Sequence, residues 1–185
     1  MRSKGVWIRL AVVAGLVGSL LLVGSAFAQG GTVVRVDPAS AAIAQGQTVI
    51  VSVKIDNVSN MIGAEVHLSF SAAVLEVVDA DASTSGTQIT NGGMLSGNVP
   101  VQNTADNAAG TIDFAVSQLG QPAVSGSGTL ATISFRAKAN GVSPIAFRSV
   151  PAAPTGVVLA DANGVALANT TANGTITVGP TTCQP

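Results

Sequence analysis

The chain has few of the side chains on which binding and catalytic sites most often depend. Its 185 residues include one histidine, one cysteine, one tryptophan and no tyrosine, and only 9% of them are charged. The single cysteine, Cys183, cannot form an internal disulfide, so the fold must be stabilised by its core alone. The chain also lacks the clustered lysine and arginine that phosphate backbones require, so nucleic acid is not expected as a partner.

A basic and then apolar segment opens the sequence. Three basic residues among the first nine precede an apolar run from Leu10 to Val23, and small residues follow between Ser25 and Ala28. This order predicts a cleaved secretory signal over residues 1–28 and a secreted, extracellular protein. The run is shorter than the about 20 residues that a membrane-spanning helix needs. No membrane span is therefore expected in the mature chain, and an uncleaved amino-terminal anchor is the alternative.

The remaining residues have the composition of a β-sheet domain. Eight basic residues less the three in the signal leave five against nine acidic ones, a net charge of −4. Valine, alanine, threonine, serine and glycine dominate, and no window shows a long helical apolar period. Asn-Gly pairs begin at residues 91, 140, 163 and 173, and this pair readily takes the positive φ angles of tight hairpins. The composition predicts an all-β fold.

Alternation of apolar and polar residues predicts the individual strands, because successive side chains of a strand point to opposite faces. Eight or nine short strands at this spacing predict a two-sheet antiparallel β-sandwich. The segments that carry most of this prediction are Gln47–Asn57, Met61–Phe70, Thr111–Ser117 and Gly128–Ala137, with a further strand near Met94–Gln102 and a hairpin of Val157–Ala160 and Val165–Leu167.

Six motifs follow one another within residues 32–178. They are Ile55-Asp-Asn-Val58, Ile62-Gly-Ala64 leading to Phe70, Val74-Leu-Glu-Val-Val78, Gly110-Thr-Ile-Asp-Phe-Ala115, Leu130-Ala-Thr-Ile-Ser-Phe-Arg-Ala137 and Gly141-Val-Ser-Pro-Ile145. In this order they resemble those of cohesin modules, which bind dockerin modules in bacterial polysaccharide-degrading complexes. Residues 179–185 are expected to form a short tail. The resemblance implies a nine-stranded jelly-roll sandwich, an extracellular location, no catalysis and dockerin binding on one sheet face. It also implies that the calcium of such a complex belongs to the dockerin.

The segment Met61–Phe70 carries the only histidine on its outward face, since the apolar residues alternate with Gly63, Glu65, His67 and Ser69. A solvated strand face and a surface for a partner protein both fit this row. On the family pattern, the docking face combines it with the strand that begins at Thr111. The candidate partner-binding residues are Gly63, Glu65, His67, Ser69, Asp113, Ala115, Ser117 and Gln118.

Metal binding and catalysis are weaker interpretations of the same row. A zinc site needs three or four converging ligands, and only Asp113 could join Glu65 and His67. A catalytic site needs a positioned nucleophile or a concave site beside the base, which a flat sheet face does not offer. The loops at Asp79 and Asp161 begin like calcium loops but lack the closing glutamate, so turns are expected there. We expect no cofactor, no metal and no enzyme activity.

Direct polysaccharide binding is the alternative function, since cohesins share their sandwich architecture with cellulose-binding modules. Such modules stack sugar rings on exposed tryptophan or tyrosine. Residues 29–185 contain neither, and their four phenylalanines alternate with polar residues as core positions do. The sequence therefore favours a dockerin-bearing protein as the partner and leaves polysaccharide as the second possibility.

Overall fold

The computed structural model describes residues 30–95 and 98–180; the predicted signal (1–28) and the last five residues of the expected tail lie outside this part. None of the described residues forms a helix, so none forms an apolar helix long enough to cross a membrane. The strands are β1 (Val33–Asp37), β2 (Ser40–Ala44), β3 (Thr48–Ser69), β4 (Leu75–Val77), β5 (Thr90–Asn91), β6 (Asn98–Asp106), β7 (Thr111–Gln118), β8 (Val124–Ala137), β9 (Gly141–Phe147), β10 (Val157–Asp161), β11 (Thr170–Ala172) and β12 (Gly174–Gly179).

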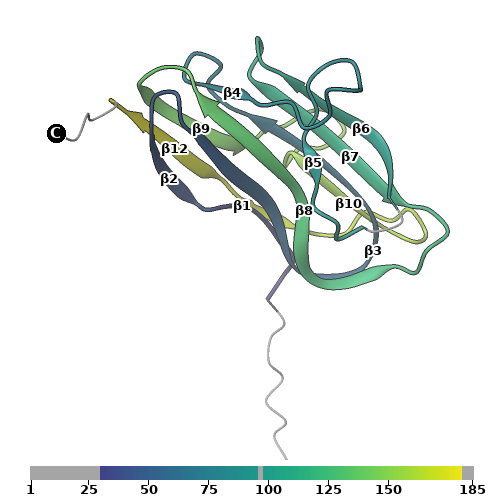
Figure 1. Ribbon diagram of the computed structural model, residues 1–185. Helices are drawn as coiled ribbons and strands as arrows, with labels where there is room; N and C mark the ends of the chain where they lie inside the picture. Colours follow the sequence, from purple (N-terminus) through teal and green to yellow (C-terminus); the bar gives the residue numbers. More distant parts are fainter. Residues whose placement is uncertain (1–29, 96–97, 181–185) are drawn as a thin grey trace, which may run out of the picture.

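The strands form two layers that share the long strand β3 (Figure 1). One layer has the order β11-β1-β3-β8, with β4 and β5 both paired to β8. The other has the order β2-β12-β9-β3-β7-β6, with β10 also paired to β3. Inward side chains of both layers pack into one core, in which Phe114 of β7 and Phe135 of β8 are at most 1% exposed. The predicted all-β sandwich is confirmed.

Strand β3 passes from one layer to the other through a bend near its middle. Asn57 and Asn60 have φ angles of 57° and 58°, a left-handed conformation that asparagine tolerates better than most residues. Strand β8 stabilises the bend, because the hydroxyls of its Ser127 and Ser125 accept hydrogen bonds from the backbone amides of Asn57 and Asn60. The two segments predicted as separate strands, Gln47–Asn57 and Met61–Phe70, are therefore one strand.

The bend also changes which residues face the core. The pairing of β3 with β8 shifts register between Ile55 and Val58 and again between Val58 and Met61. As a result Met61 is fully buried, whereas Ile62, predicted to face inward, is only half-buried. From Ala64 onward the predicted alternation holds, and Ala64, Val66 and Leu68 are buried.

Several short elements differ from the sequence-based expectation. The strand expected near Met94–Gln102 is observed as β6, which begins later and continues to Asp106. Residues Val165–Leu167 do not form a strand, and only a single bridge between Ala160 and Ala166 remains of the predicted hairpin. Strands β2 and β11 were not predicted, because alanine- and threonine-rich stretches of three to five residues show no clear alternation.

Candidate functional site

Strands β10, β3, β7 and β6 lie side by side and form one outward face. Pairing of β3 with β7 sets Gly63 opposite Ser117, Glu65 opposite Ala115, and His67 opposite Asp113. Ser69 continues the row opposite Thr111. The structure therefore brings together seven of the eight predicted residues in two adjacent rows, as expected for neighbouring strands with the same inward and outward alternation.

Gln118 is the exception. It shares the alternation of Ile112, Phe114 and Val116, whose side chains face the core, and it is only 4% exposed. Its side-chain amide donates a hydrogen bond to the carbonyl of Pro122, in the loop that follows β7. Gln118 therefore shapes this loop from inside and is not on the outward face.

His67 lies on this face but is buried, which disagrees with the solvated-face interpretation of the row. Its exposure is 6%. The segment between β9 and β10 lies beside it in the sheet: the Arg148 amide donates to the His67 carbonyl at 2.9 Å, and the His67 amide donates to the Gly156 carbonyl at 2.8 Å. This segment is distant in sequence, so its position beside the histidine could not be read from strand alternation.

Two carboxylates hold the imidazole of His67 from opposite sides. Its Nδ1 lies 2.5 Å from Asp113 Oδ1 and its Nε2 lies 2.6 Å from Glu65 Oε1. A ring with protons on both nitrogens donates to both carboxylates, whereas a neutral ring has only one N–H group to donate. Arg148 completes the cluster, since its Nη2 donates to the same oxygen of Asp113 at 2.5 Å. His67 and Arg148 thus fix the positions of Glu65 and Asp113.

The chemistry available to this cluster is electrostatic. Ser69 is the next outward residue along β3, but its hydroxyl points to the Ala146 carbonyl at 3.4 Å and not to the imidazole. Among the described residues, no group of three or more histidine, cysteine, aspartate or glutamate side chains is placed to hold a metal ion. The cluster presents two fixed carboxylates at a sheet face, an arrangement suited to hydrogen bonds and ion pairs with a partner.

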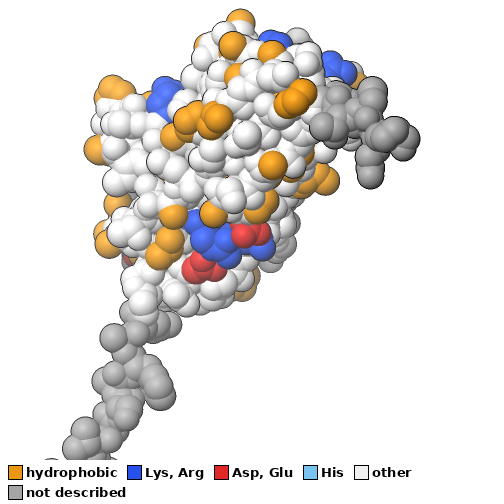
Figure 2. Space-filling model, turned by 90° about the vertical axis from the view of Figure 1, so that its left-hand side faces the viewer, with side chains coloured by type: hydrophobic (Ala, Val, Ile, Leu, Met, Phe, Trp, Pro, Cys, Tyr) orange, Lys and Arg blue, Asp and Glu red, His pale blue; other side chains and the backbone are white. Residues whose placement is uncertain are grey.

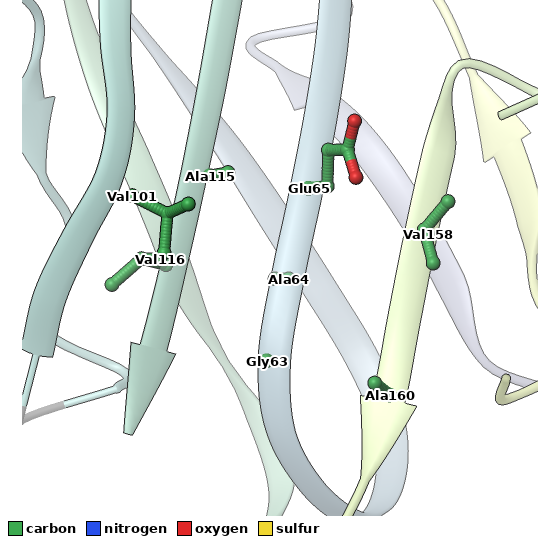
Figure 3. A pocket seen from close by; sticks show the side chains of 8 residues that line it. All are labelled: Gly63, Ala64, Glu65, Val101, Ala115, Val116, Val158 and Ala160. Atoms are coloured by element: carbon green, nitrogen blue, oxygen red, sulfur yellow. The ribbon is translucent and has the colours of Figure 1, made fainter. Parts of the chain in front are cut away.

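An open hollow adjoins the charged cluster on the same face (Figure 3). It measures about 200 Å³. Small or apolar residues of all four strands line it, and Glu65 is the only charged residue among them. The lining residues are Gly63, Ala64, Glu65, Val101, Ala115, Val116, Val158 and Ala160. No sequence pattern predicts this hollow, because it depends on which strands are neighbours.

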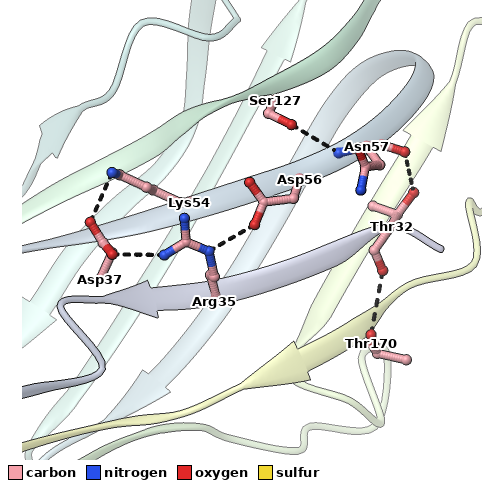
Figure 4. A network of polar contacts seen from close by, with 8 residues as sticks. All are labelled: Thr32, Arg35, Asp37, Lys54, Asp56, Asn57, Ser127 and Thr170. Atoms are coloured by element: carbon pink, nitrogen blue, oxygen red, sulfur yellow. Dashed lines mark hydrogen bonds and ion pairs between the residues drawn. The ribbon is translucent and has the colours of Figure 1, made fainter. Parts of the chain in front are cut away.

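The other layer carries a second polar cluster, on β1 and β3 (Figure 4). Arg35 bonds Asp56 and Asp37 at 2.7 Å each, and Lys54 lies 2.8 Å from Asp37. The two carboxylates raise the pKa of Arg35, and the bonds from Lys54 and Arg35 lower the pKa of Asp37. Figure 2 shows acidic and basic side chains gathered in one compact group on a largely uncharged face. These charges pair with one another, so the cluster joins two strands of this layer.

Comparison with known proteins identifies the family. The sequence profile of the family described as "Cohesin domain" matches residues 32–178. The chain belongs to the cohesin family. It is 31% identical over 145 residues to cellulose-binding protein A of Clostridium cellulovorans; the match covers 76% of this chain but only 7% of that protein. This cohesin therefore corresponds to a small part of its curated relative.

Solved cohesins share its fold. A non-cellulosomal cohesin from the archaeon Archaeoglobus fulgidus is 21% identical, with a TM-score of 0.61 over 82% of this chain and 94% of that one. A cohesin in a type II cohesin–X–dockerin complex from Acetivibrio cellulolyticus is 20% identical, with a TM-score of 0.62 over 80% of this chain and 99% of that one. At this identity the likeness concerns the fold, and it agrees with the predicted jelly-roll sandwich.

Proposed function

We propose that this cohesin is a non-catalytic, exported protein-binding module that docks a dockerin-bearing protein on the outward face of β10, β3, β7 and β6. The observation that carries the proposal is the pair Glu65 and Asp113, which His67 and Arg148 hold in place on a regular sheet face. Family membership supports the kind of partner, since solved cohesins of the same fold occur in complexes with dockerins. On this proposal residues 1–28 direct export, residues 32–178 bind, and residues 179–185 are a tail.

The composition of the face supports docking of a large, regular surface. Gly63, Ala115 and Ser117 are small, so a helix can approach the strands closely. Glu65 and Asp113 supply hydrogen-bond acceptors that fix the register of that helix. A stable interface buries about 1,600 Å² in total, and its binding energy is concentrated in aromatic or arginine anchors. Because the predicted residues include no such anchor, the anchors must come from the partner.

His67 has a positioning role on this proposal. A side chain that is 8% exposed contributes little contact area to a partner. It orients the carboxylates of Glu65 and Asp113, and these oxygens are the groups that meet the partner. The dockerin carries the calcium of the complex, as the family resemblance implies, so the cohesin contributes no metal ligand.

Calorimetric titration with each dockerin module of the source organism, in calcium-containing buffer, tests the proposal. We expect binding by the wild-type protein, and weaker binding by the Glu65→Ala and Asp113→Ala variants. Glu76→Ala is the matched control, because Glu76 lies on β4 in the other layer and pairs with Arg136 there. If no dockerin binds the wild-type protein, or if Glu76→Ala weakens binding as much as Glu65→Ala does, the proposed face is wrong.

Polysaccharide binding receives no comparable support from the structure. Phe70, Phe114 and Phe135 are buried, and Phe147 packs against the core. They are the phenylalanines of the described residues, which leaves no aromatic ring there for sugar stacking. A pull-down on cellulose, xylan and chitin is the control experiment, and retention without any partner protein would reverse this ranking.

A further inference from the structure

We propose that the hollow beside Glu65 receives one large apolar side chain of the docked partner, and that Glu65 binds a lysine or arginine next to that side chain. This inference rests on the proposed function and assigns the partner's chemistry at one place on the docking face. Three observations carry it. The pairing of β10, β3, β7 and β6 brings small residues together, one carboxylate oxygen of Glu65 has no partner among the described residues, and the predicted docking residues include no aromatic or arginine anchor.

The hollow arises where small residues of three strands meet in one row. Ala160 of β10 pairs with Gly63 of β3, and Gly63 pairs with Ser117 of β7. No side chain projects at Gly63, and a Cβ added there would have only ordinary contacts, at 3.8 Å from the Val116 carbonyl oxygen and 3.9 Å from Ala160 Cβ. The sheet surface is therefore depressed along this row.

The residues around the depression are apolar apart from Glu65. Val158 and Glu65 face each other across the β10–β3 pair, and the small Ala115 continues their row on β7. On the β6 side, a register shift between Pro100 and Gln102 displaces Val101, which is 70% exposed. An exposed valine at the rim of an apolar hollow loses water contact once a partner side chain enters, which favours docking.

The size and lining of the hollow suit a side chain of the partner better than a small-molecule ligand. Pockets for drug-sized ligands usually measure about 300–1,000 Å³ and contain several converging polar groups. This hollow measures about 200 Å³ and has one charged group at its edge. It suits a phenylalanine, methionine or leucine side chain, since an aromatic or aliphatic anchor can fill a pocket at the centre of an interface.

Glu65 determines the charge of the neighbouring partner residue. Its Oε1 is held by the His67 ring, whereas its Oε2 contacts no other described residue within bonding distance. Figure 3 shows this carboxyl group on the β10 side of β3, beside Val158. Residues 29–185 carry a net charge of −4, so a cationic donor is also favoured at long range. A lysine or arginine adjacent to the apolar anchor would bind the Glu65 carboxylate and would also be attracted by the net negative charge.

Filling the hollow is the direct test, and the chain offers a matched control. Gly63→Val fills it with a residue that strands favour, at a position without positive φ. Gly179→Val makes the same change at the end of β12, where an added Cβ meets no atom within 4 Å. We expect Gly63→Val to weaken dockerin binding about tenfold or more, the loss typical of an anchor excluded from its pocket, and Gly179→Val to leave it unchanged. Thermal unfolding of both variants tests whether they are folded, and Ala160→Leu provides a second filling variant.

Substitutions in the dockerin identify the anchor. Each large apolar residue on its exposed helix faces is replaced by alanine, and one such replacement is expected to weaken binding to wild-type cohesin but not to Gly63→Val. Glu65→Gln tests the charge: we expect it to reduce the salt dependence of binding, because an ion pair is screened by salt and an amide contact is not. Unchanged salt dependence would overturn the cationic assignment.

The outcomes separate this inference from the proposed function. If the wild-type protein binds a dockerin and Gly63→Val binds it equally well, the proposed role of the hollow is wrong and the docking face is retained. No binding by the wild-type protein overturns both. Self-association of the wild-type protein in sedimentation, lost in Gly63→Val, would show that the occupant is a second copy of this chain and would also overturn the inference.

Discussion

The charged cluster around His67 should stabilise the fold as well as orient the docking face, and Asp113→Asn measures that contribution. Asp113 Oδ1 lies 2.5 Å from both His67 Nδ1 and Arg148 Nη2. A hydrogen bond to a charged group contributes about 1.5–3 kcal/mol. The side chains of Asp113 and Arg148 are 26% and 33% exposed, so solvent screening reduces that range. The amide keeps one weaker acceptor, and we expect a loss of about 2 kcal/mol for the two bonds together.

Denaturation by guanidinium chloride, with the midpoint and slope fitted separately, measures this loss. A domain of this size loses about 2–4 °C of melting temperature per kcal/mol, so the expected decrease is about 4–8 °C. Glu76→Gln is the control, because Glu76 pairs with Arg136, whose side chain is 58% exposed, and such a pair contributes about 1 kcal/mol or less. If Asp113→Asn destabilises the protein no more than Glu76→Gln does, the cluster is not a stabilising element and the reasoning is wrong.

Three further predictions concern the core, the bend of β3 and the loop after β10. Phe135→Ala should cost about 3–5 kcal/mol, because Phe135 is fully buried and makes an edge contact with Phe70 at 5.3 Å between ring centres; a cost as small as that of Ile50→Ala, at a 64% exposed position, would contradict the core assignment. Asn57→Ala should cost about 1–2 kcal/mol in chemical denaturation and Asn57→Gly less, since alanine is strained at positive φ and glycine is not; equal losses would exclude backbone strain as the cause. Backbone N–H groups of Val165 and Asn163 lower the pKa of Asp161 from 3.8, so its contribution to stability is present above that pH and is lost as the pH falls through the folded-state value. The difference in unfolding free energy between wild type and Asp161→Ala should therefore shrink in acid, and a difference that is constant down to pH about 2 would contradict this assignment.

Much of the fold could be predicted because strand alternation is a local property. Ala64, Val66 and Leu68 face the core, and Glu65 faces outward, since consecutive side chains of a strand alternate wherever the strand is regular. The same reasoning placed Asp113 on the outward side of its own strand, and the motif series indicated the family. Alternation failed at the bend. Asn57 and Asn60 have left-handed backbone conformations there, and the pairing of β3 with β8 shifts register on either side of Val58.

The candidate site depended on contacts between residues that are far apart in the sequence. A solvated face and a partner surface both fit His67 by its position in the strand, but its ring is held between Asp113 and Glu65, and the segment from Arg148 to Gly156 lies beside it in the sheet. The family pattern assigns Gln118 to the docking face, yet its place in the alternation puts it on the core side.

The hollow beside Glu65 shows most plainly what strand alternation predicts and what only strand pairing decides. The sequence identifies Gly63 as a small outward residue, but a depression forms only because Ala160 and Ser117 become its neighbours in the sheet. The direction of a side chain follows from its own strand, whose period of two is set by backbone geometry. The neighbours of that side chain, and with them its burial, charge environment and available partners, follow from the pairing of strands, which is set by packing of the whole core.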